Sequence, residues 1–377
     1  MESTPVPASV AIMDYFGEVE DPRMDRQKKH LLAEILFIAL CTVLTGGQTF
    51  NDMLTFGQSK EVWLRRHLSL AHGIPSHDTF RRVFCLIKPA TFIDCLVRWT
   101  QALREGVSGE VVAIDGKSLR RTGKTKDTIV HLVSAWAATN RLVLAQIKVD
   151  EKSNEITAVP ELLRMLELAG CIVTTDAMGA QKDIAKEISE ADADYVLALK
   201  GNHSKVHDEV RTFLDDAIRR KEAHLDYWEK VEKDHGRIET RRAWISEKLG
   251  WFEDKPKWEK LRSVGVIEST RQLGEKTTTE RHYFLCSLPA QAKAFAQAAR
   301  SHWSIENSLH WVLDVSLQED QSRARTGYAA ENLALLRKLA LNLIRQEPSL
   351  PRKSIKGRQL TAALNENYLA QLLTGEI

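Results

Sequence analysis

The first hundred positions repeat apolar residues at helical spacing. The run LLAEILFIALCTVL predicts a buried helix, and Gly46 and Gly47 end it. The stretch FNDMLTFGQSKEVWLRRHL predicts a second helix. DTFRRVFCLI predicts a third, with Ser76 or Asp78 as its N-cap. We therefore expect residues 1–105 to form an all-helical N-terminal domain.

The pattern changes to strands from residue 109 onwards. EVVAID, IVHLVSAWAA and RLVLAQIKVD are three β-rich runs, followed by a helix near 157–169, the strand CIVTTDA, a helix and the strand DYVLALK. This order predicts a mixed α/β layer over residues 106–204. Residues 205–290 begin with a charged helix and continue as a β-rich region, and residues 291–377 are mainly helical with a basic tail.

Composition is that of an ordinary soluble globular protein. The chain has 377 residues and a net charge of only +2, from 53 basic and 51 acidic residues, so nucleic-acid binding must depend on local patches. The five cysteines form no CxxC pair, which disfavours a disulfide framework or a zinc site. The N-terminus has no signal-peptide pattern. The longest apolar run contains Glu34 and is too short to span a membrane, so we expect a cytoplasmic protein.

Two predicted strands each end on an aspartate. VVAID ends at Asp115, and IVTTDA carries Asp176 at the corresponding position. If the strands are neighbours, both carboxylates lie at the carboxyl edge of the sheet, where a divalent cation such as Mg²⁺ would relieve their repulsion. A lone aspartate at a strand end is as often a turn or N-cap residue, so the pair carries more weight than either residue alone.

A third acid could complete a site for two metal ions. In RSHWSIENSLHWVLDVSLQEDQSRAR, the residues His302, Glu306 and His310 are four apart and so share one helix face. Glu306 is the best candidate, because it stands among aromatic and apolar residues where an uncompensated charge is costly. We interpret the histidines as making local polar contacts in preference to binding zinc. Three other acids are further candidates for the third ligand: Asp314, Glu319 and Asp320.

Six motifs occur in a fixed order along the chain: AIDGKSLRRT, EKSNEITAVPELL, TTDAMGAQ, LALKGNH, DHGRIETR and HWSIENSLHWVLDVSLQEDQSR. Together they resemble the DDE transposases of bacterial insertion sequences, most closely the branch that includes the H-repeat-associated proteins. The resemblance covers nearly the whole chain. It implies an α/β fold with a ribonuclease-H-like mixed-sheet catalytic core, formed by 106–204 and 291–377 and interrupted by a β-rich insertion at 205–290.

The same resemblance implies an activity. Asp115, Asp176 and Glu306 would form an acidic triad that holds two Mg²⁺ ions, for which Mn²⁺ could substitute. The enzyme would cleave the ends of its insertion sequence and join the 3′-hydroxyl strand to target DNA. Its partners would be double-stranded terminal repeats and target DNA, with a homodimer pairing two ends at the nucleoid. One departure is Leu313, which stands where related transposases often carry a lysine.

Basic and polar residues near these motifs are the candidates for DNA contact. Lys117, Arg120 and Arg121 follow Asp115 closely, where cations could meet the phosphates beside the scissile bond. The other candidates lie near the second and third acids, in DHGRIETRR, or in the third helix of a helix-turn-helix-like segment: Lys200, Asn202, His235, Arg237, Arg241, Arg300, His302, Arg323, Arg81 and Arg82. A plain turn accounts for Asn202 equally well, and a solvated edge strand accounts for DHGRIETRR.

Two other functions stay open from the residues alone. A catalytically silent or co-opted transposase-derived protein would bind the terminal repeats as a regulator without cutting them. A metal phosphatase or nuclease would turn over small phosphoesters or RNA without recognising specific DNA ends. The presence of all three expected acids favours an active transposase over a decayed one.

Overall fold

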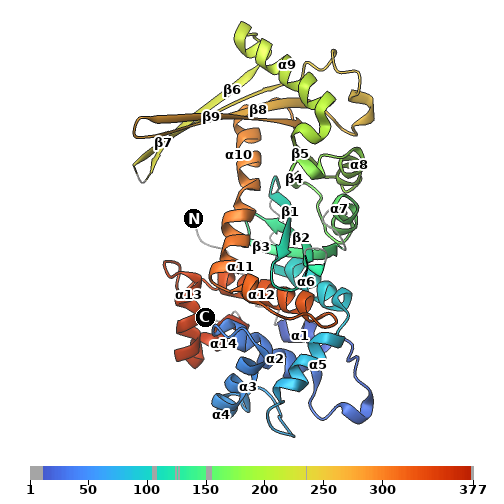
Figure 1. Ribbon diagram of the computed structural model, residues 1–377, viewed down its shortest axis with the longest axis vertical. Helices are drawn as coiled ribbons and strands as arrows, with labels where there is room; N and C mark the ends of the chain where they lie inside the picture. The colour runs from blue at the N-terminus through green and yellow to red at the C-terminus, as the bar shows by residue number, and fades with distance from the viewer. Residues whose placement is uncertain are drawn as a thin grey trace.

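The computed structural model of the protein describes residues 12–103, 108–123, 125, 128–149, 155–234 and 236–374 (Figure 1). His235, one of the predicted DNA contacts, lies outside these residues. Helices from both ends of the chain gather at one end of the molecule, the sheet that carries the aspartates lies in the middle, and long β-hairpins project at the other end (Figure 1). No helix in these ranges is both long and apolar enough to cross a membrane.

The N-terminal region is helical, as predicted. Its α-helices in the described chain are α1 (Ile12–Gly17), α2 (Leu32–Leu44), α3 (Phe50–Ser59), α4 (Glu61–Leu64), α5 (His77–Leu86) and α6 (Pro89–Leu103). The predicted second helix is divided at Lys60, whose backbone leaves the helical conformation between α3 and α4. The N-cap of α5 is Ser76, because its hydroxyl accepts a hydrogen bond from the Thr79 N–H at 3.3 Å.

The first five strands form the core of a mixed sheet: β1 (Val111–Leu119), β2 (Val130–Ala137), β3 (Leu142–Val149), β4 (Ile172–Thr175) and β5 (Asp194–Leu199). Their spatial order is β3-β2-β1-β4-β5. β1, β4 and β5 run parallel, whereas β2 is antiparallel to both β1 and β3. This is the ribonuclease-H-like arrangement that the resemblance implied, so the predicted fold class is confirmed.

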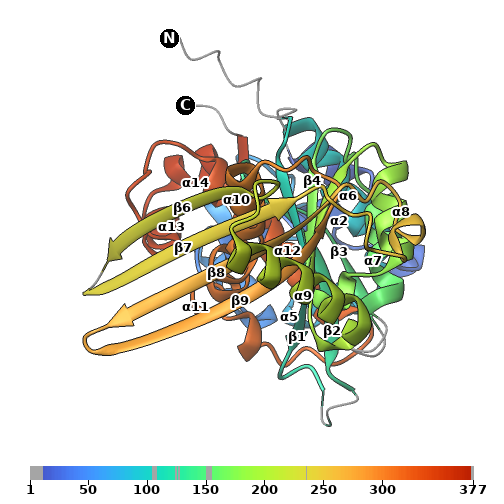
Figure 2. The same cartoon turned by 90° about the horizontal axis from the view of Figure 1, so that it is seen from above.

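Four further strands continue the same sheet: β6 (Asp226–Asp234), β7 (Arg237–Ser246), β8 (Ser263–Leu273) and β9 (Lys276–Cys286). β9 pairs antiparallel with β5, so the strands of the described chain form one nine-stranded sheet. α9 (Ser204–Arg220) precedes β6 and packs against β8 and β9. The outer halves of the two hairpins extend beyond the helices (Figure 2). The sequence predicted a β-rich region here, but not its continuity with the core sheet.

Helices cover both faces of the core sheet. α7 (Glu155–Arg164) and α8 (Lys182–Glu190) lie on one side, and α10 (Ala292–His302) lies on the other (Figure 1). On β1, Gly116 faces α7 so closely that an added Cβ would lie 2.6 Å from the Glu155 carboxylate. Since side chains alternate along a strand, the preceding residue, Asp115, faces the α10 side.

The C-terminal helices connect the sheet to the N-terminal helices. They are α12 (Ala329–Gln346), α13 (Ile355–Leu364) and α14 (Glu366–Thr374). α12 is buried along most of its length between β3 and the helices α2, α5 and α6. The Asn332 side-chain amide donates to the Phe84 and Ile87 carbonyls at 2.9 Å each, which fixes α12 to the end of α5.

Replacing Asn342 on α12 with leucine is expected to destabilise the protein by about 2–4 kcal/mol. Asn342 is fully buried, and its side chain both accepts from the Val143 N–H at 2.8 Å and donates to the Val143 carbonyl at 2.9 Å. The substitution leaves both backbone groups of this edge strand buried without partners. Urea unfolding of the variant would measure the loss. Asn367→Leu, an exposed position on α14, is the control and should change the free energy of unfolding by less than about 0.5 kcal/mol.

Candidate active site

Asp115 and Asp176 lie beside each other on neighbouring parallel strands. Asp176 directly follows β4, whereas β1 continues past Asp115 to Leu119 and does not end there as the sequence predicted. The pairing of β1 with β4 places Ile114 opposite Thr175, so the aspartates that follow occupy adjacent positions. Asp176 is also the N-cap of a 3-10 turn, η4 (Ala177–Gly179), where its Oδ1 accepts two backbone N–H hydrogen bonds at 3.0 and 3.3 Å. These bonds fix the orientation of the Asp176 carboxylate.

Glu306 approaches Asp115 and Asp176 from the helical layer that follows α10. It belongs to a π-helical turn, η7 (Ile305–His310), that continues from α10 into α11 (Trp311–Val315). A cavity of about 170 Å³ is lined by Asp115, Asp176 and Glu306, together with residues of β4, β5, β9 and α10. We call it the three-acid cavity. Three segments far apart in the sequence therefore bring their carboxylates to one cavity.

The electrostatics of the three-acid cavity centre on Asp115. The pKa of this carboxyl group is raised to about 7. Burial is the main cause, and the negative charges of Asp176, Glu306 and Glu155 add to it, against a hydrogen bond from the Gly116 backbone that lowers the pKa. Without a cation nearby, Asp115 is thus partly protonated at neutral pH. A positive ion in the cavity would stabilise the ionised form of Asp115.

The donor set of the three-acid cavity fits a hard divalent cation. All three acids offer carboxylate oxygens, which are the ligands that Mg²⁺ prefers. In the described ranges, no three His, Cys, Asp or Glu side chains are close enough together to hold a metal ion as they stand. Mutual repulsion keeps carboxylates apart when no cation is between them, so the acids would have to draw together around the ion.

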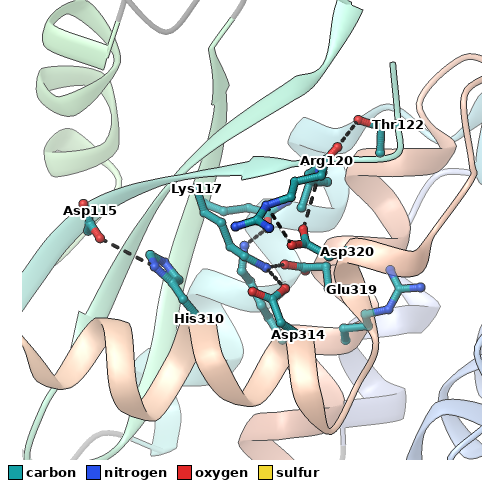
Figure 3. Close-up of polar contacts among 12 residues, drawn as sticks. Asp115, Lys117, Arg120, Thr122, His310, Asp314, Glu319 and Asp320 are labelled. Atoms are coloured by element: carbon teal, nitrogen blue, oxygen red, sulfur yellow. Dashed lines mark hydrogen bonds and ion pairs between the residues drawn. The ribbon is translucent and has the colours of Figure 1, made fainter. Parts of the chain in front are cut away.

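Lys117 does not extend into solvent as a DNA contact, because it forms two internal ion pairs. Its Nζ lies 2.5 Å from Asp314 Oδ1 and 2.6 Å from Glu319 Oε2, and its side chain is only 10% exposed (Figure 3). Burial lowers the pKa of Lys117, but the charges and hydrogen bonds of Glu319 and Asp314 outweigh burial and raise it overall. Asp314 and Glu319, which we considered as metal ligands, hold this ammonium group instead.

His302 and His310 make local polar contacts at the sheet. His302 Nδ1 lies 3.0 Å from the Thr174 hydroxyl, and burial lowers its pKa to about 4. His310 Nδ1 lies 3.5 Å from Asp115 Oδ2, and burial lowers its pKa to about 3 (Figure 3). Both imidazoles are therefore neutral at physiological pH. For His302, this favours a local role over the phosphate contact that we predicted.

Two predicted DNA contacts lie at the loop after β5. Lys200 is exposed and lines the three-acid cavity. Asn202 belongs to a 3-10 turn, η5 (Gly201–His203), and its side-chain amide donates to the Ala177 carbonyl at 2.7 Å. Asn202 therefore ties the loops after β4 and β5 together.

A basic groove adjoins the three-acid cavity on the β6–β9 sheet. It has a volume of about 680 Å³, and Trp303 and His282 line both spaces. Its cationic lining consists of Arg237, Arg241, Arg271 and Arg300. Arg241 is only 13% exposed, because it pairs with Glu232 and Glu239, whereas the Arg300 side chain is 53% exposed. We call this surface the basic groove.

The remaining predicted DNA contacts are exposed but scattered. Arg120 pairs with Asp320 at 3.3 Å and stays 81% exposed. Arg121, the next residue, is exposed, and so is Arg323, three residues after Asp320. Arg81 and Arg82 lie on the exposed surface of α5 at the far end of the molecule. The three-acid cavity does not include any of these five arginines among its lining residues.

Arg271 and Trp303 line the basic groove but were not predicted as site residues from the sequence. Arg271 lies opposite Glu239 in the pairing of β7 with β8, so it shares a sheet face with the DHGRIETRR arginines. The alternation within DHGRIETRR identified the face. The pairing partner on β8 was needed to find Arg271, and no local pattern contains it.

The strand order and the three-acid cavity agree with the class that the sequence motifs resemble, the DDE transposases. Two family profiles agree with this class: one described as the transposase DDE domain matches residues 107–343, and one described as DDE_Tnp_1-associated matches residues 13–100. The chain belongs to the DDE transposase family, in the branch of the H-repeat-associated proteins.

Relatives match along almost the full length. The chain is 39% identical over 371 residues to "Putative transposase YncI" of Escherichia coli O157:H7, covering 96% of this chain and 94% of that protein. It is 36% identical to "H repeat-associated putative transposase YhhI" of Escherichia coli K12, covering 97% and 98%. A piggyBac transposase synaptic complex with hairpin DNA gives a TM-score of 0.41 at 10% identity, covering 97% of this chain and 77% of that one. That similarity is too low to support an argument.

Proposed function

We propose that this transposase cleaves phosphodiester bonds at the ends of its own insertion sequence and transfers the 3′-hydroxyl strand to target DNA. The observation that carries this proposal is the convergence of Asp115, Asp176 and Glu306 on one cavity from three distant parts of the chain. Family membership supports the same chemistry. The N-terminal region, residues 1–105, would bind the element ends, with Arg81 and Arg82 as exposed contacts on α5.

The three acids would hold two Mg²⁺ ions, with Mn²⁺ as a substitute. Asp115 would bridge the pair, and Asp176 and Glu306 would each hold one ion. When bound, such ions activate the attacking hydroxyl and stabilise the departing 3′-oxygen. The hydrogen bonds to Asp176 Oδ1 keep that carboxylate oriented, and Lys200 would attract a phosphate oxygen at the cavity edge.

The basic groove would carry the DNA toward the three-acid cavity. The groove shares His282 and Trp303 with the cavity, so a strand whose scissile phosphate meets the acids would place neighbouring phosphates along the groove. Neutralising phosphates releases counterions and makes binding weaken with salt. The partners would be double-stranded terminal repeats and target DNA, with two protomers pairing two ends. The protein would act in the cytoplasm, at the nucleoid.

The Arg271→Ala, Arg300→Ala double variant is expected to weaken DNA binding and its salt dependence. Both side chains line the basic groove, and each lost phosphate contact should reduce the slope of log K against log salt by about 0.9. Binding of an end duplex at several salt concentrations would measure the slope. Arg211→Ala on α9, on the opposite face of the β6–β9 sheet, is the control. Equal slopes for the double variant and the wild type would contradict DNA passage through the groove.

An assay with DNA that carries the repeats flanking the gene tests the proposed function. With Mg²⁺, the wild-type protein should cut at the repeat boundary and join the ends to a second DNA. Specific binding without cutting would instead support the catalytically silent regulator. Hydrolysis of small phosphoesters or RNA, without preference for the repeats, would support a general metal phosphatase or nuclease.

A further inference from the structure

One face of the long helix that carries Glu306 contacts β4 or β1 at three of four successive positions, and Glu306 at the remaining position lines the three-acid cavity. His302, Glu306, His310 and Asp314 are each four residues apart. Their contacts follow the same order along the sheet: β4, the three-acid cavity, Asp115 and the following same-face residue of β1. The helix thus lies along the sheet in a single register from α10 to α11.

In a regular α-helix neighbours in this series share a face, but the four residues together would spread over about 120° of the helix surface. Four residues turn through about 400°, so the face would rotate by about 40° at each step. The π-helical turn η7 contains more residues per turn and offsets this rotation where Glu306 stands. The position of the Glu306 carboxylate relative to Asp115 therefore depends on how the helix is aligned against β1.

Lys117 fixes this alignment at the end of the shared face. It lies two residues after Asp115 on β1, on the same side of the sheet. Its ammonium group reaches between Asp314 on α11 and Glu319 in the 3-10 turn η8 (Glu319–Gln321), as Figure 3 shows. One side chain of the strand therefore holds two consecutive segments of the chain that carries Glu306.

This contact resists sliding because its charges are buried. The Glu319 side chain is 0% exposed. Burial raises the pKa of Glu319, but the cations of Lys117, Lys338 and Arg337 outweigh burial and keep the pKa below its ordinary value. Separating Lys117 from Glu319 would leave a carboxylate without its nearest cation in the protein interior, which is strongly unfavourable.

We propose that Lys117 is a positioning residue: held by Asp314 and Glu319, it sets the register of the Glu306 helix against β1 and so the placement of Glu306 relative to Asp115. The inference rests on the proposed function, in which these two acids share a metal centre. Lys117 acts through Asp115 and Glu306 and does not contact the metals or the DNA. Its contribution is to the affinity of the three-acid cavity for divalent cations.

Mn²⁺ binding to the free protein, followed by the electron paramagnetic resonance of unbound Mn²⁺, tests this role without DNA or activity. The informative variant is Lys117→Met combined with Glu319→Gln, which removes one cation and its closest anion and leaves the net charge unchanged. Lys338 and Arg337 then lose the charge of Glu319, so circular dichroism checks that the variant is folded. The expected result is Mn²⁺ binding at least about tenfold weaker in the folded variant. Lys148→Met on β3 of the same sheet, which breaks an ion pair to Glu331 on α12, is the matched control and should leave Mn²⁺ affinity unchanged.

The sign of the effect separates positioning from simple charge. Lys117→Met alone removes a cation near three carboxylates, so Coulomb attraction by itself would tighten Mn²⁺ binding. Weaker binding in both Lys117 variants supports the inference, and unchanged or tighter binding in the folded double variant overturns it. If Asp115→Ala leaves Mn²⁺ affinity at the wild-type value, the proposed metal centre is wrong and this inference is wrong with it.

Discussion

Asp115→Asn should reduce DNA cleavage by at least about 10³-fold, equivalent to about 4 kcal/mol of transition-state stabilisation. The amide has nearly the volume of the carboxylate, so the packing of β1 is retained. It lacks the negative charge that would bridge two cations, and so the three-acid cavity would lose its central ligand. Cleavage of an end duplex in Mg²⁺ would be compared with binding of the same duplex, which should change by less than about threefold.

The matched control for this prediction is Asp208→Asn, an exposed aspartate on α9 that loses the same charge far from the cavity. Its cleavage rate should equal that of the wild type. Asp115→Asn cutting DNA at more than about a tenth of the wild-type rate would show that the carboxylate is not a metal bridge. Loss of binding together with cleavage would indicate misfolding or a role in DNA contact.

The metal-free protein is expected to lose about 2–4 kcal/mol of stability through Asp115 as the pH rises from about 4 to about 7. The ordinary pKa of aspartate is 3.8, whereas burial and the neighbouring carboxylates raise that of Asp115 to about 7 in the folded protein. In this window the folded state binds a proton that the unfolded state has released. Stability therefore falls with rising pH, and the loss is complete above pH 7.

Comparison with Asp115→Asn isolates this effect from other titrating groups. His302 and His310 have pKa values lowered by burial, so they destabilise the protein at low pH in both forms. Urea unfolding at pH 4.5 and at pH 8 would measure the free energy of unfolding of both proteins. The wild type should be less stable relative to the variant at pH 8 than at pH 4.5. Adding Mg²⁺ at pH 8 should restore stability to the wild type only. An equal pH dependence in both proteins would refute the raised pKa.

The core of the fold could be predicted because its strands appear as local apolar patterns in the sequence. Each apolar strand is visible in the sequence, and two of the predicted strands end on an aspartate, so Asp115 and Asp176 could be paired before their strands were seen to be neighbours. The predicted end of the first strand was wrong, because β1 continues to pair with β2 as far as Leu119. The motif order then indicated the ribonuclease-H-like arrangement, which the strand order confirms. The roles of the three acids as metal ligands stay predictions.

Lys117 shows why the rest could not be predicted. Its neighbours in the sequence are basic, which suggested a surface for phosphates, but its partner Asp314 is 197 residues away. Whether a cation faces DNA or a buried carboxylate depends on which segments the fold brings together. The pairing of β5 with β9 poses the same problem, since strand patterns identify strands and not their partners.

The shared ladder between β5 and β9 also limits how the outer hairpins can move. Four residue pairs, from Val196 with Cys286 to Leu199 with Tyr283, join β9 of the outer hairpins to β5. β5 is the neighbour of β4, the strand that Asp176 follows. Independent movement of the hairpins would require the backbone hydrogen bonds between β5 and β9 to break. We therefore expect the hairpins to move together with the core sheet as one rigid unit.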